Sequence, residues 1–192
     1  ESVDEIYHCA ADVRHYAVDI DAYINTNVGG TQNMVALAKK AKAKLYHMST
    51  CSVSGDSMKN TSNNAVFTED DFDIGQEWEK NIYIKSKYLA EKAIFAAIAD
   101  GVDAKIFRLG RLVGRESDGK FQSSPDTNAF YLVLKGFCQI GAIPVEIAKA
   151  PIDLMPIDRS AKEVLLLKRC DAVTYHIMNP LPPTIGEVFT SM

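Results

Sequence analysis

Two overlapping tyrosine and lysine pairs lie in the segment NIYIKSKYLAEKAIFAAI at residues 81–98, namely Tyr83 with Lys87 and Tyr88 with Lys92. Residues four positions apart share one face of a helix, so each pair could point into one pocket. A tyrosine can give a proton to a substrate oxygen, and a neighbouring lysine cation lowers the tyrosine pKa from its usual ~10 toward neutrality. The alternative is an ordinary helix surface, because a lysine stem often packs while its amine reaches water.

Helix phase and position distinguish the two pairs. At about 100° per residue, Lys87 falls on the same apolar face as Tyr83, whereas Tyr88 falls at the margin of that face and Lys92 on the opposite side. Glu91 departs from the pattern, because it falls near the apolar face. Tyr83 also lies at the beginning of the helix, where a site beside a sheet edge would need it. We therefore expect Tyr83 and Lys87 to be catalytic, and Tyr88 and Lys92 to serve packing and the surface.

Hydroxyl groups gather upstream in the segment HMSTCSVSG, at Ser49, Thr50, Ser52 and Ser54. A hydroxyl at the end of a strand can hydrogen-bond a substrate carbonyl, while a tyrosine beside it donates a proton as hydride reaches the carbon. The alternative is a turn in which these side chains cap the backbone, and we expect this for most of the four hydroxyls.

Secondary-structure patterns predict an α/β fold. We expect strands at residues 3–11, 43–50 and 103–114, separated by helices at 22–43 and 81–98. This alternation is typical of a Rossmann-like, doubly wound parallel sheet with crossover helices. Ligands bind such sheets outside the carboxyl ends of the strands, so the segments CAAD, HMSTCSV and RLGRLVG should meet at one edge.

A long polar connection separates the second strand from the second helix. Residues 55–80 far exceed the usual length of ~2 to 6 residues, which favours a functional loop. Beyond the third strand, the patterns predict three helices and one strand, at residues 126–144, 159–170, 184–192 and 173–180. We expect residues 1–120 to form the carboxyl-terminal part of a Rossmann domain, and residues 121–192 to form part of a substrate-binding region whose strands return to the sheet.

Composition limits the classes of function. The formal net charge is −4, with acidic and basic residues interspersed, which gives no electrostatic footprint for nucleic acid or an anionic membrane. No apolar run approaches the ~20 residues that span a bilayer, and the first residues lack a signal-peptide pattern, so we expect a cytoplasmic location. The four cysteines (Cys9, Cys51, Cys138 and Cys170) lack the short spacings of zinc or redox sites, so we expect buried free thiols and no metal site.

Five segments carry a resemblance to a known family. VDEIYHCAADV, NTNVGGTQNMVALA, YHMSTCSVSG, YIKSKYLAEK and FRLGRLVGR occur in the order and at the spacings of the extended short-chain dehydrogenase/reductases, which the chain resembles over nearly its whole length. The resemblance implies that Thr50 is the catalytic hydroxyl and Tyr83 the proton donor. It implies that Lys87 holds the nicotinamide ribose and lowers the tyrosine pKa. It also implies that Asn27 supports the site and its water, the alternative being an ordinary polar residue in the first turns of a helix.

The same resemblance places residues around a cofactor. Ala10 and Ala11 match positions where the backbone passes the cofactor, and Leu109, Gly110 and Val113 should line its nicotinamide side together with the tyrosine and lysine. Gly110 has a reason of its own, because glycine allows a close backbone approach or a tight turn.

Two charged residues beyond this turn, Arg111 and Asp158, are not assigned to the cofactor site. Arg111 sits where many sugar-nucleotide members of the family have a smaller polar residue, and it either contacts substrate or is solvated. Asp158, which ends the segment MPID, is expected to cap the amino terminus of a helix.

Within the family, the segments NIYIKSKYLAEK, RLGRLVGRESDGKFQ, NAFYLVLKG and GAIP most resemble the thioester reductase branch. These are terminal reductase domains of nonribosomal peptide and polyketide synthetases, with relatives among carboxylic acid reductases and aminoadipate reductases. The resemblance implies reduction of an acyl or peptidyl thioester, held on the phosphopantetheine arm of a carrier protein, to an aldehyde or an alcohol. It implies NADPH as the hydride donor and leaves NADH open.

Two alternative functions are consistent with the sequence, and the second belongs to a different functional class. One is a sugar-nucleotide epimerase or dehydratase of the same family, which uses NAD and shares the catalytic residues. The other is a non-catalytic nucleotide-binding member, which would have no need of a proton donor.

The glycine-rich turn with which the family begins is not found in the sequence. This GxxGxxG turn seats the cofactor pyrophosphate at a helix amino terminus, whereas Gly29 and Gly30 lie inside a helix pattern. We therefore expect the chain to be a fragment that starts near the fourth strand of the domain, and to bind cofactor poorly and be inactive by itself.

Overall fold

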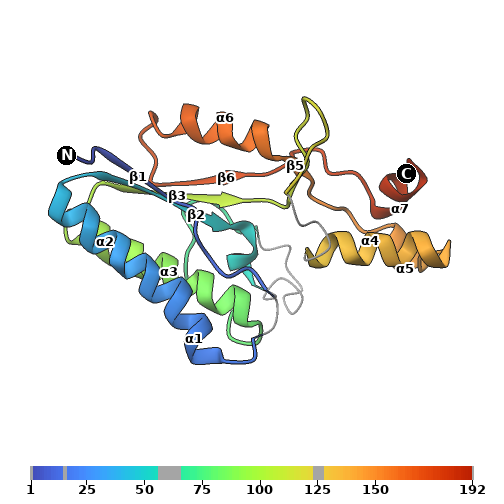
Figure 1. The fold of residues 1–192 in the computed structure, drawn as a ribbon, viewed down its shortest axis with the longest axis horizontal. Helices are drawn as coiled ribbons and strands as arrows, with labels where there is room; N and C mark the ends of the chain where they lie inside the picture. Colours follow the sequence, from blue (N-terminus) through green and yellow to red (C-terminus); the bar gives the residue numbers. More distant parts are fainter. Residues whose placement is uncertain (1, 15–16, 56–65, 123–127, 192) are drawn as a thin grey trace. The chain divides into compact units, whose positions relative to one another are not determined.

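The computed structural model describes residues 2–14, 17–55, 66–122 and 128–191 (Figure 1). The chain forms two compact units. The first comprises Glu1–Leu109 with Val164–Ile177, and the second Gly110–Glu163 with Met178–Met192. The units therefore do not follow a single cut at residue 120, because a late segment of the chain returns to the first unit.

A four-stranded parallel sheet forms the centre of the first unit, which confirms the predicted α/β class. Its strands lie in the order β1, β2, β3, β6, with bounds Glu5–His8, Lys44–Thr50, Ala104–Leu109 and Thr174–Ile177. The register pairs His8 with His47 and Thr50 with Leu109, so the carboxyl ends of these strands meet at one edge.

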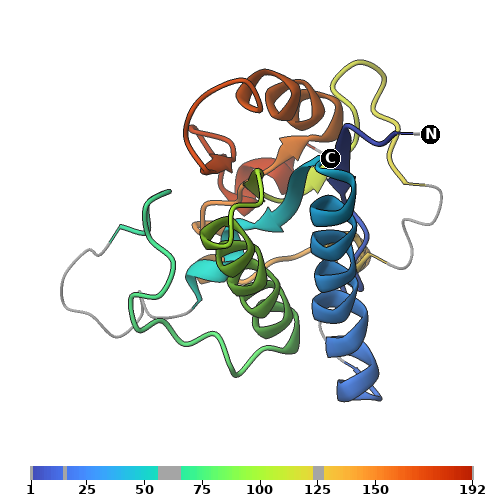
Figure 2. The same cartoon turned by 90° about the vertical axis from the view of Figure 1, so that its left-hand side faces the viewer.

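Helices α2 and α3 lie side by side along the sheet (Figure 2). The predicted helix at 22–43 forms as a continuous rod of three parts: α1 at Ile20–Ile24, a π-helical segment at Asn25–Gly29 and α2 at Gly30–Ala41. The second predicted helix is α3, Ile82–Ala99, and the Asn81 carboxamide caps it by accepting from the amides of Tyr83 (2.9 Å) and Ile84 (3.3 Å). Tyr83 therefore lies in the first turn, as expected.

The apolar core of this unit lies between the two helices and the amino-terminal parts of the strands. Leu45, Ile94 and Ile106 are fully buried there. The remaining buried members of the cluster are Ile6, Ala38, Ala43, Ala97, Val102 and Ala104. Alternate residues of a strand face one side of a sheet, so the strands that bring these side chains into the core also direct His8, His47 and Ser49 toward the same helices.

The second unit contains shorter elements. Its two-stranded parallel sheet pairs β4 (Leu112–Val113) with β5 (Met155–Pro156). Its helices are α4 at Ala129–Ile140, α5 at Val145–Ala148, the first residues of α6 at Ile157–Leu167, and α7 at Ile185–Thr190. The strand expected at 103–114 is thus two strands, and they belong to different units.

The break between these strands explains Gly110. A β-carbon on Gly110 would lie 1.7 Å from Oδ2 of Asp153. The Asp153 carboxylate accepts hydrogen bonds from the amides of Arg111 at 3.3 Å and Asn179 at 2.7 Å, so it holds the second unit together at this point. Glycine is required here for the close approach of a carboxylate.

Asp158 does not cap a helix as expected. It lies inside the first turn of α6, and its carboxylate accepts from the amides of Glu116 (2.9 Å) and Ser117 (3.3 Å). These backbone donors, Glu116 first, lower the pKa of Asp158 to about 2. The sequence pattern located the aspartate at a helix start but could not reveal the distant loop that it binds.

The expectation of buried cysteines is wrong. None of the four cysteines forms a disulfide; Cys9, Cys138 and Cys170 are exposed, and Cys51 is partly exposed. Apolar neighbours in sequence do not fix the face of a helix or the end of a strand on which a thiol lies. Among the described residues there is no group of three or more side chains that could hold a metal ion.

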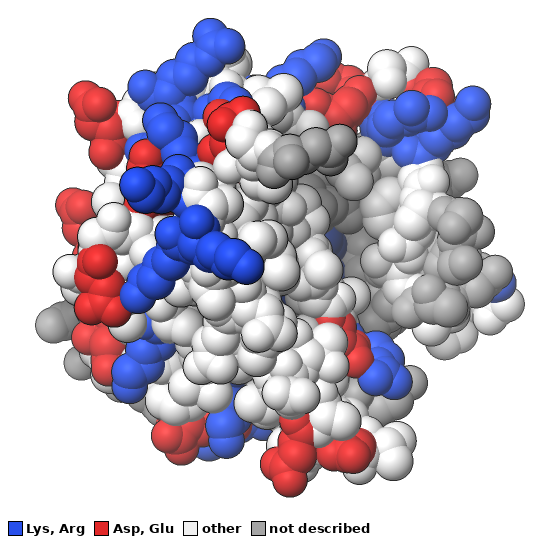
Figure 3. Space-filling view, turned by 60° about the vertical axis from the view of Figure 1, so that its left-hand side comes forward, with Lys and Arg blue, Asp and Glu red and all other residues white. Residues whose placement is uncertain are grey.

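Charged side chains of both signs occur on the face drawn in Figure 3, as the interspersed sequence suggests. Some form exposed ion pairs, such as Lys39 with Asp100 at 3.0 Å. Within the part of the chain that the structure describes, no helix has the length and apolar character needed to cross a membrane.

Candidate active site

The carboxyl edge of the sheet brings several predicted site residues together in the first unit. Thr50 ends β2 and pairs with Leu109 at the end of β3. Ala10 is exposed and Ala11 partly exposed just beyond β1. Gly110 and Val113, which were expected beside them, belong to the second unit.

Thr50 is in extended conformation and is only 8% exposed. Its Oγ1 accepts from the amide of Ser52 at 3.2 Å and thereby caps the short 3-10 turn Cys51–Ser54. This is the capping alternative considered for the hydroxyl cluster. An accepted hydrogen bond uses a lone pair and leaves the hydroxyl proton free to be donated, so capping is compatible with contact to a substrate oxygen.

Lys87 is buried at the junction of α3 and β2. Its Nζ donates to the carbonyl of Met48 at 3.1 Å, two residues before Thr50. Burial lowers the pKa of Lys87 from 10.5 to about 8, against the opposing effects of Glu91 and Cys9. The ammonium therefore loses its proton at a lower pH than that of an exposed lysine.

Two buried histidines lie near enough to Lys87 for its charge to act on them. Burial lowers the pKa of His47 well below its usual value, and it lowers that of His8 as well, with Lys87 adding to both effects. Their rings lie 5.3 Å apart, and His8 Nε2 is 3.1 Å from Thr31 Oγ1. No hydrogen bond is found for either ring nitrogen of His47 among the described residues. Neutral histidines add no competing positive charge next to the lysine.

Asn27 links the loop after β1 to α3. Its Oδ1 accepts from the amide of Asp12 at 2.7 Å, and its Nδ2 donates to the Asp12 carbonyl at 2.8 Å and to Ser86 Oγ at 2.9 Å. Ser86 Oγ in turn donates to the carbonyl of Tyr83 at 2.8 Å. The asparagine lies in the π-helical segment, a local irregularity that often marks functional sites. The sequence pattern predicted a helix here but did not reveal the π turn.

The second tyrosine and lysine pair serves packing and the surface, although Tyr88 lies deeper than the margin of the apolar face on which helix phase placed it. Tyr88 is 2% exposed, and its ring stacks between Phe72 at 4.7 Å and Trp78 at 4.3 Å. Burial raises the pKa of Tyr88 to about 12. Lys92 is exposed.

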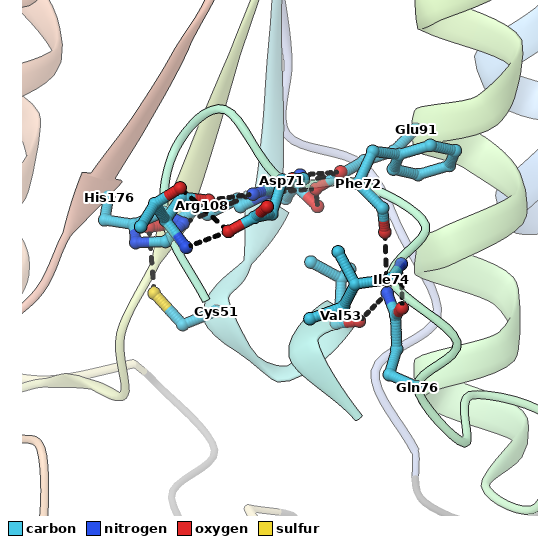
Figure 4. A network of polar contacts seen from close by, with 11 residues as sticks. Cys51, Val53, Asp71, Phe72, Ile74, Gln76, Glu91, Arg108 and His176 are labelled. Atoms are coloured by element: carbon cyan, nitrogen blue, oxygen red, sulfur yellow. Dashed lines mark hydrogen bonds and ion pairs between the residues drawn. The ribbon is translucent and has the colours of Figure 1, made fainter. Parts of the chain in front are cut away.

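A buried ion pair between Glu91 and Arg108 was missed by the sequence interpretation. Neither side chain is exposed to solvent, and Arg108 Nη2 lies 2.9 Å from Glu91 Oε2 (Figure 4). Two signals could have indicated it. Glu91 fell near the apolar face of its helix, and Arg108 stands in a strand that is otherwise apolar at alternate positions.

Comparison with known proteins connects this geometry to a family. The family model described as "Male sterility protein", an NAD-binding model, matches residues 1–164. A linear gramicidin synthase polypeptide of Brevibacillus parabrevis is 26% identical over 182 residues, which are 93% of this chain and 3% of that protein. The L-2-aminoadipate reductase of Candida glabrata, in its large subunit, is 30% identical over 175 residues, 86% of this chain and 12% of that protein.

A solved thiolation-reductase di-domain from an archaeal non-ribosomal peptide synthetase has the same fold, with a TM-score of 0.85 and 34% identity. The match covers 94% of this chain and 39% of that one. Shorter matches, over 58% of the chain or less, are to UDP-glucuronic acid decarboxylases of Arabidopsis thaliana. The chain thus spans well under half of each of these relatives.

We predict that Asn27→Ala destabilises the protein by about 1–3 kcal/mol, because it removes the acceptor of the part-buried Asp12 amide and the buried hydrogen bond to the Ser86 hydroxyl. Urea unfolding measures the change. The matched control is Asn33→Ala on the exposed side of α2, which should stay within about 0.5 kcal/mol of the wild type. Equal effects of the two substitutions would contradict a linking role for Asn27.

Proposed function

The chain belongs to the NAD-binding family described as male sterility protein, within the extended short-chain dehydrogenase/reductases, and we propose that it supplies the catalytic residues of an NAD(P)H-dependent thioester reductase. The family consists of NAD(P)-dependent oxidoreductases. The observation that carries the proposal is the position of Tyr83 and Lys87 in the first turns of α3, with Lys87 bonded to the strand that ends in Thr50.

The residues at the sheet edge suit a nicotinamide cofactor. Ala10 and Ala11 offer small, accessible side chains beyond β1, and the Lys87 ammonium is a donor for ribose hydroxyls. We assign Tyr83 and Leu109, which belong to the same unit, to this cofactor site. The bound cofactor supplies a hydride to the substrate carbonyl carbon.

The protein residues stabilise the oxygen of that carbonyl. As its carbon becomes tetrahedral, the oxygen gains negative charge, which the Thr50 hydroxyl stabilises by donating a hydrogen bond. Tyr83 gives the oxygen its proton, and the charge of Lys87 makes the tyrosine a stronger acid. Asn27 keeps α3 and the loop after β1 together around this group. For a thioester, the resulting thiohemiacetal releases the thiol and leaves an aldehyde, which a second reduction converts to an alcohol.

The substrate class rests on the nature of the relatives. One of them is an aminoadipate reductase, and another contains a reductase domain joined to a thiolation domain. We therefore propose an acyl or peptidyl chain on the phosphopantetheine arm of a carrier protein as substrate, that carrier protein as partner, and NADPH as the hydride donor.

The substrate class is tested by turnover in the full-length protein. An acyl thioester on a phosphopantetheinylated carrier protein should give aldehyde or alcohol with consumption of NADPH, at a rate at least about tenfold above that with NADH. UDP-glucuronic acid serves as the comparison substrate, because shorter matches connect the chain to decarboxylases of that sugar nucleotide. Turnover of the sugar nucleotide without thioester reduction would refute the proposal.

The choice between the two tyrosines is tested by removing each hydroxyl. Tyr83→Phe should lower kcat by about 10²-fold or more, the usual scale for loss of a general acid. Tyr88→Phe keeps the rings stacked with Phe72 and Trp78 and should leave kcat within about threefold. Steady-state kinetics of the two variants decide, and equal losses would contradict the assignment.

The pH dependence follows from the burial of Lys87. Its pKa of about 8 means that the ammonium persists below that pH and loses its proton above it, so kcat should fall as the pH rises through about 8. Lys87→Met should remove this alkaline limb along with most of the rate. Lys92→Met, at the exposed lysine of the same helix, should retain the limb. A wild-type rate that stays level to pH 10 would rule out a required Lys87 cation with this pKa.

A further inference from the structure

The buried ion pair on α3 and β3 has a third member on β2. The Ser49 hydroxyl donates to Glu91 Oε1 at 2.5 Å. The Arg108 guanidinium donates from Nε to both oxygens of the Glu91 carboxylate at 3.2 Å (Figure 4). Ser49 is 5% exposed, and Glu91 and Arg108 are wholly buried. Ser49 and Arg108 are also direct neighbours in the sheet register. We call these three residues the Ser49 cluster.

The Ser49 cluster lies beside the lysine of the proposed site. Lys87 and Glu91 are one helical turn apart on α3, and they bind successive residues of β2: Lys87 the carbonyl of Met48, and Glu91 the hydroxyl of Ser49. The next residue along that strand is Thr50. Two adjacent contacts thus fix the helix against the strand at the point where the proposed catalytic hydroxyl leaves the sheet.

Arg108 also fastens the segment that leads into α3. Its Nη1 donates to the carbonyl of Thr68 at 3.3 Å and its Nη2 to that of Asp71 at 2.8 Å. Gln76 continues the attachment, because its Nε2 donates to the carbonyls of Phe72 at 2.6 Å and Val53 at 3.1 Å. Arg108 thus holds this segment at Thr68 and Asp71, and Gln76 holds it at Phe72 and against Val53.

A buried ion pair is a poor source of net stability. Removing two charges from water costs about as much as their attraction returns, and well-packed apolar residues often do as well or better. The contribution of a buried charge pair is then to fix the position of the elements that carry it. Its directional hydrogen bonds allow one arrangement of helix and strands, whereas apolar contacts allow several.

From this geometry we propose that the Ser49 cluster positions a residue of the proposed reductase. The cluster keeps the Lys87 amine buried against β2 and aligned with Thr50 on the same strand. Ser49, Glu91 and Arg108 act through Lys87 and do not touch the substrate. The inference rests on the proposed function for its catalytic consequence, but the position of Lys87 can be measured without turnover.

Ser49→Ala is the most suitable variant. Replacing Glu91 or Arg108 alone would leave an unpaired buried charge, at a cost of about 3–5 kcal/mol that could prevent folding. Ser49→Ala removes one hydrogen bond and keeps the ion pair. Ser160→Ala is the matched control, because Ser160 is also buried and its hydroxyl has no hydrogen-bond partner among the described residues. Ser49→Thr restores a hydroxyl at the same position.

Two measurements on the full-length protein test the proposal. The first is kcat and KM with thioester and NADPH: Ser49→Ala should lower kcat about tenfold, with both KM values within twofold, since small misplacements of catalytic groups cost up to ~10²-fold. The second is competitive acetylation with acetic anhydride, read by mass spectrometry. It should label Lys87 at least about threefold faster in Ser49→Ala, because a less tightly held amine is more accessible, while Lys92 stays unchanged as an internal reference. Ser49→Thr should return both quantities toward the wild type, and Ser160→Ala should change neither.

The two proposals can fail separately. If the wild type reduces no thioester, the proposed function fails, and the labelling experiment alone decides the role of the Ser49 cluster. If Lys87 is labelled equally in the wild type and in Ser49→Ala, the positioning role is overturned whatever happens to kcat. A loss of kcat in Ser160→Ala equal to that in Ser49→Ala would also overturn it.

Discussion

The burial of one ammonium group against a strand is the constraint on which the rest of this site depends. Lys87 Nζ donates to the carbonyl of Met48 at 3.1 Å in a place where solvent is nearly absent. Burial of a charge is costly unless hydrogen bonds and opposite charge compensate for it. Here compensation is partial, because burial lowers the pKa of Lys87 to about 8 although Glu91 acts in the opposite direction. These surroundings thus allow Lys87 to be charged but make its proton easier to remove than that of an exposed lysine.

The surroundings of Lys87 follow from that requirement. His8 and His47 are buried near Lys87, and a positive charge on either ring would lower the pKa of Lys87 further. Burial keeps both histidines neutral, and their own pKa values are lowered further by Lys87. The carboxylate one helical turn from the lysine, that of Glu91, is neutralised in turn by Arg108 at 2.9 Å. The positive charge of Arg108 therefore weakens the electrostatic attraction between the Glu91 carboxylate and the Lys87 ammonium.

The local features of this arrangement could be predicted from the sequence, and the long-range ones could not. Helix phase placed Lys87 on the apolar face and Lys92 on the opposite side, where the structure has them, because a period of about 3.6 residues is a property of the helix alone. The partner of Glu91 is 17 residues away on a strand, and the partner of Asn27 is a backbone group on the loop after β1. The reason for Gly110, a carboxylate more than forty residues later in the chain, is likewise invisible to any local pattern. Periodicity predicts which face a residue occupies, while its partner depends on the fold.

The sheet face that α3 covers is apolar toward the amino ends of the strands and polar toward their carboxyl ends. One helix can therefore stabilise the fold and also carry the proposed catalytic residues. Toward the amino ends of the strands it presents Leu45 and Ile106, which pack on Ile94 in the last turns of α3. Toward the carboxyl ends, the same face presents Ser49 and Arg108 to Glu91 in the middle of the helix. An apolar contact tolerates small shifts, but it places α3 on the sheet and excludes water from the layer. The polar contacts near the carboxyl ends therefore form where water is excluded, so each hydrogen bond is strong and each unpaired polar group lowers the stability of the fold. The apolar contacts therefore hold α3 on the sheet, and the polar contacts of Lys87 and Glu91 align the helix with β2.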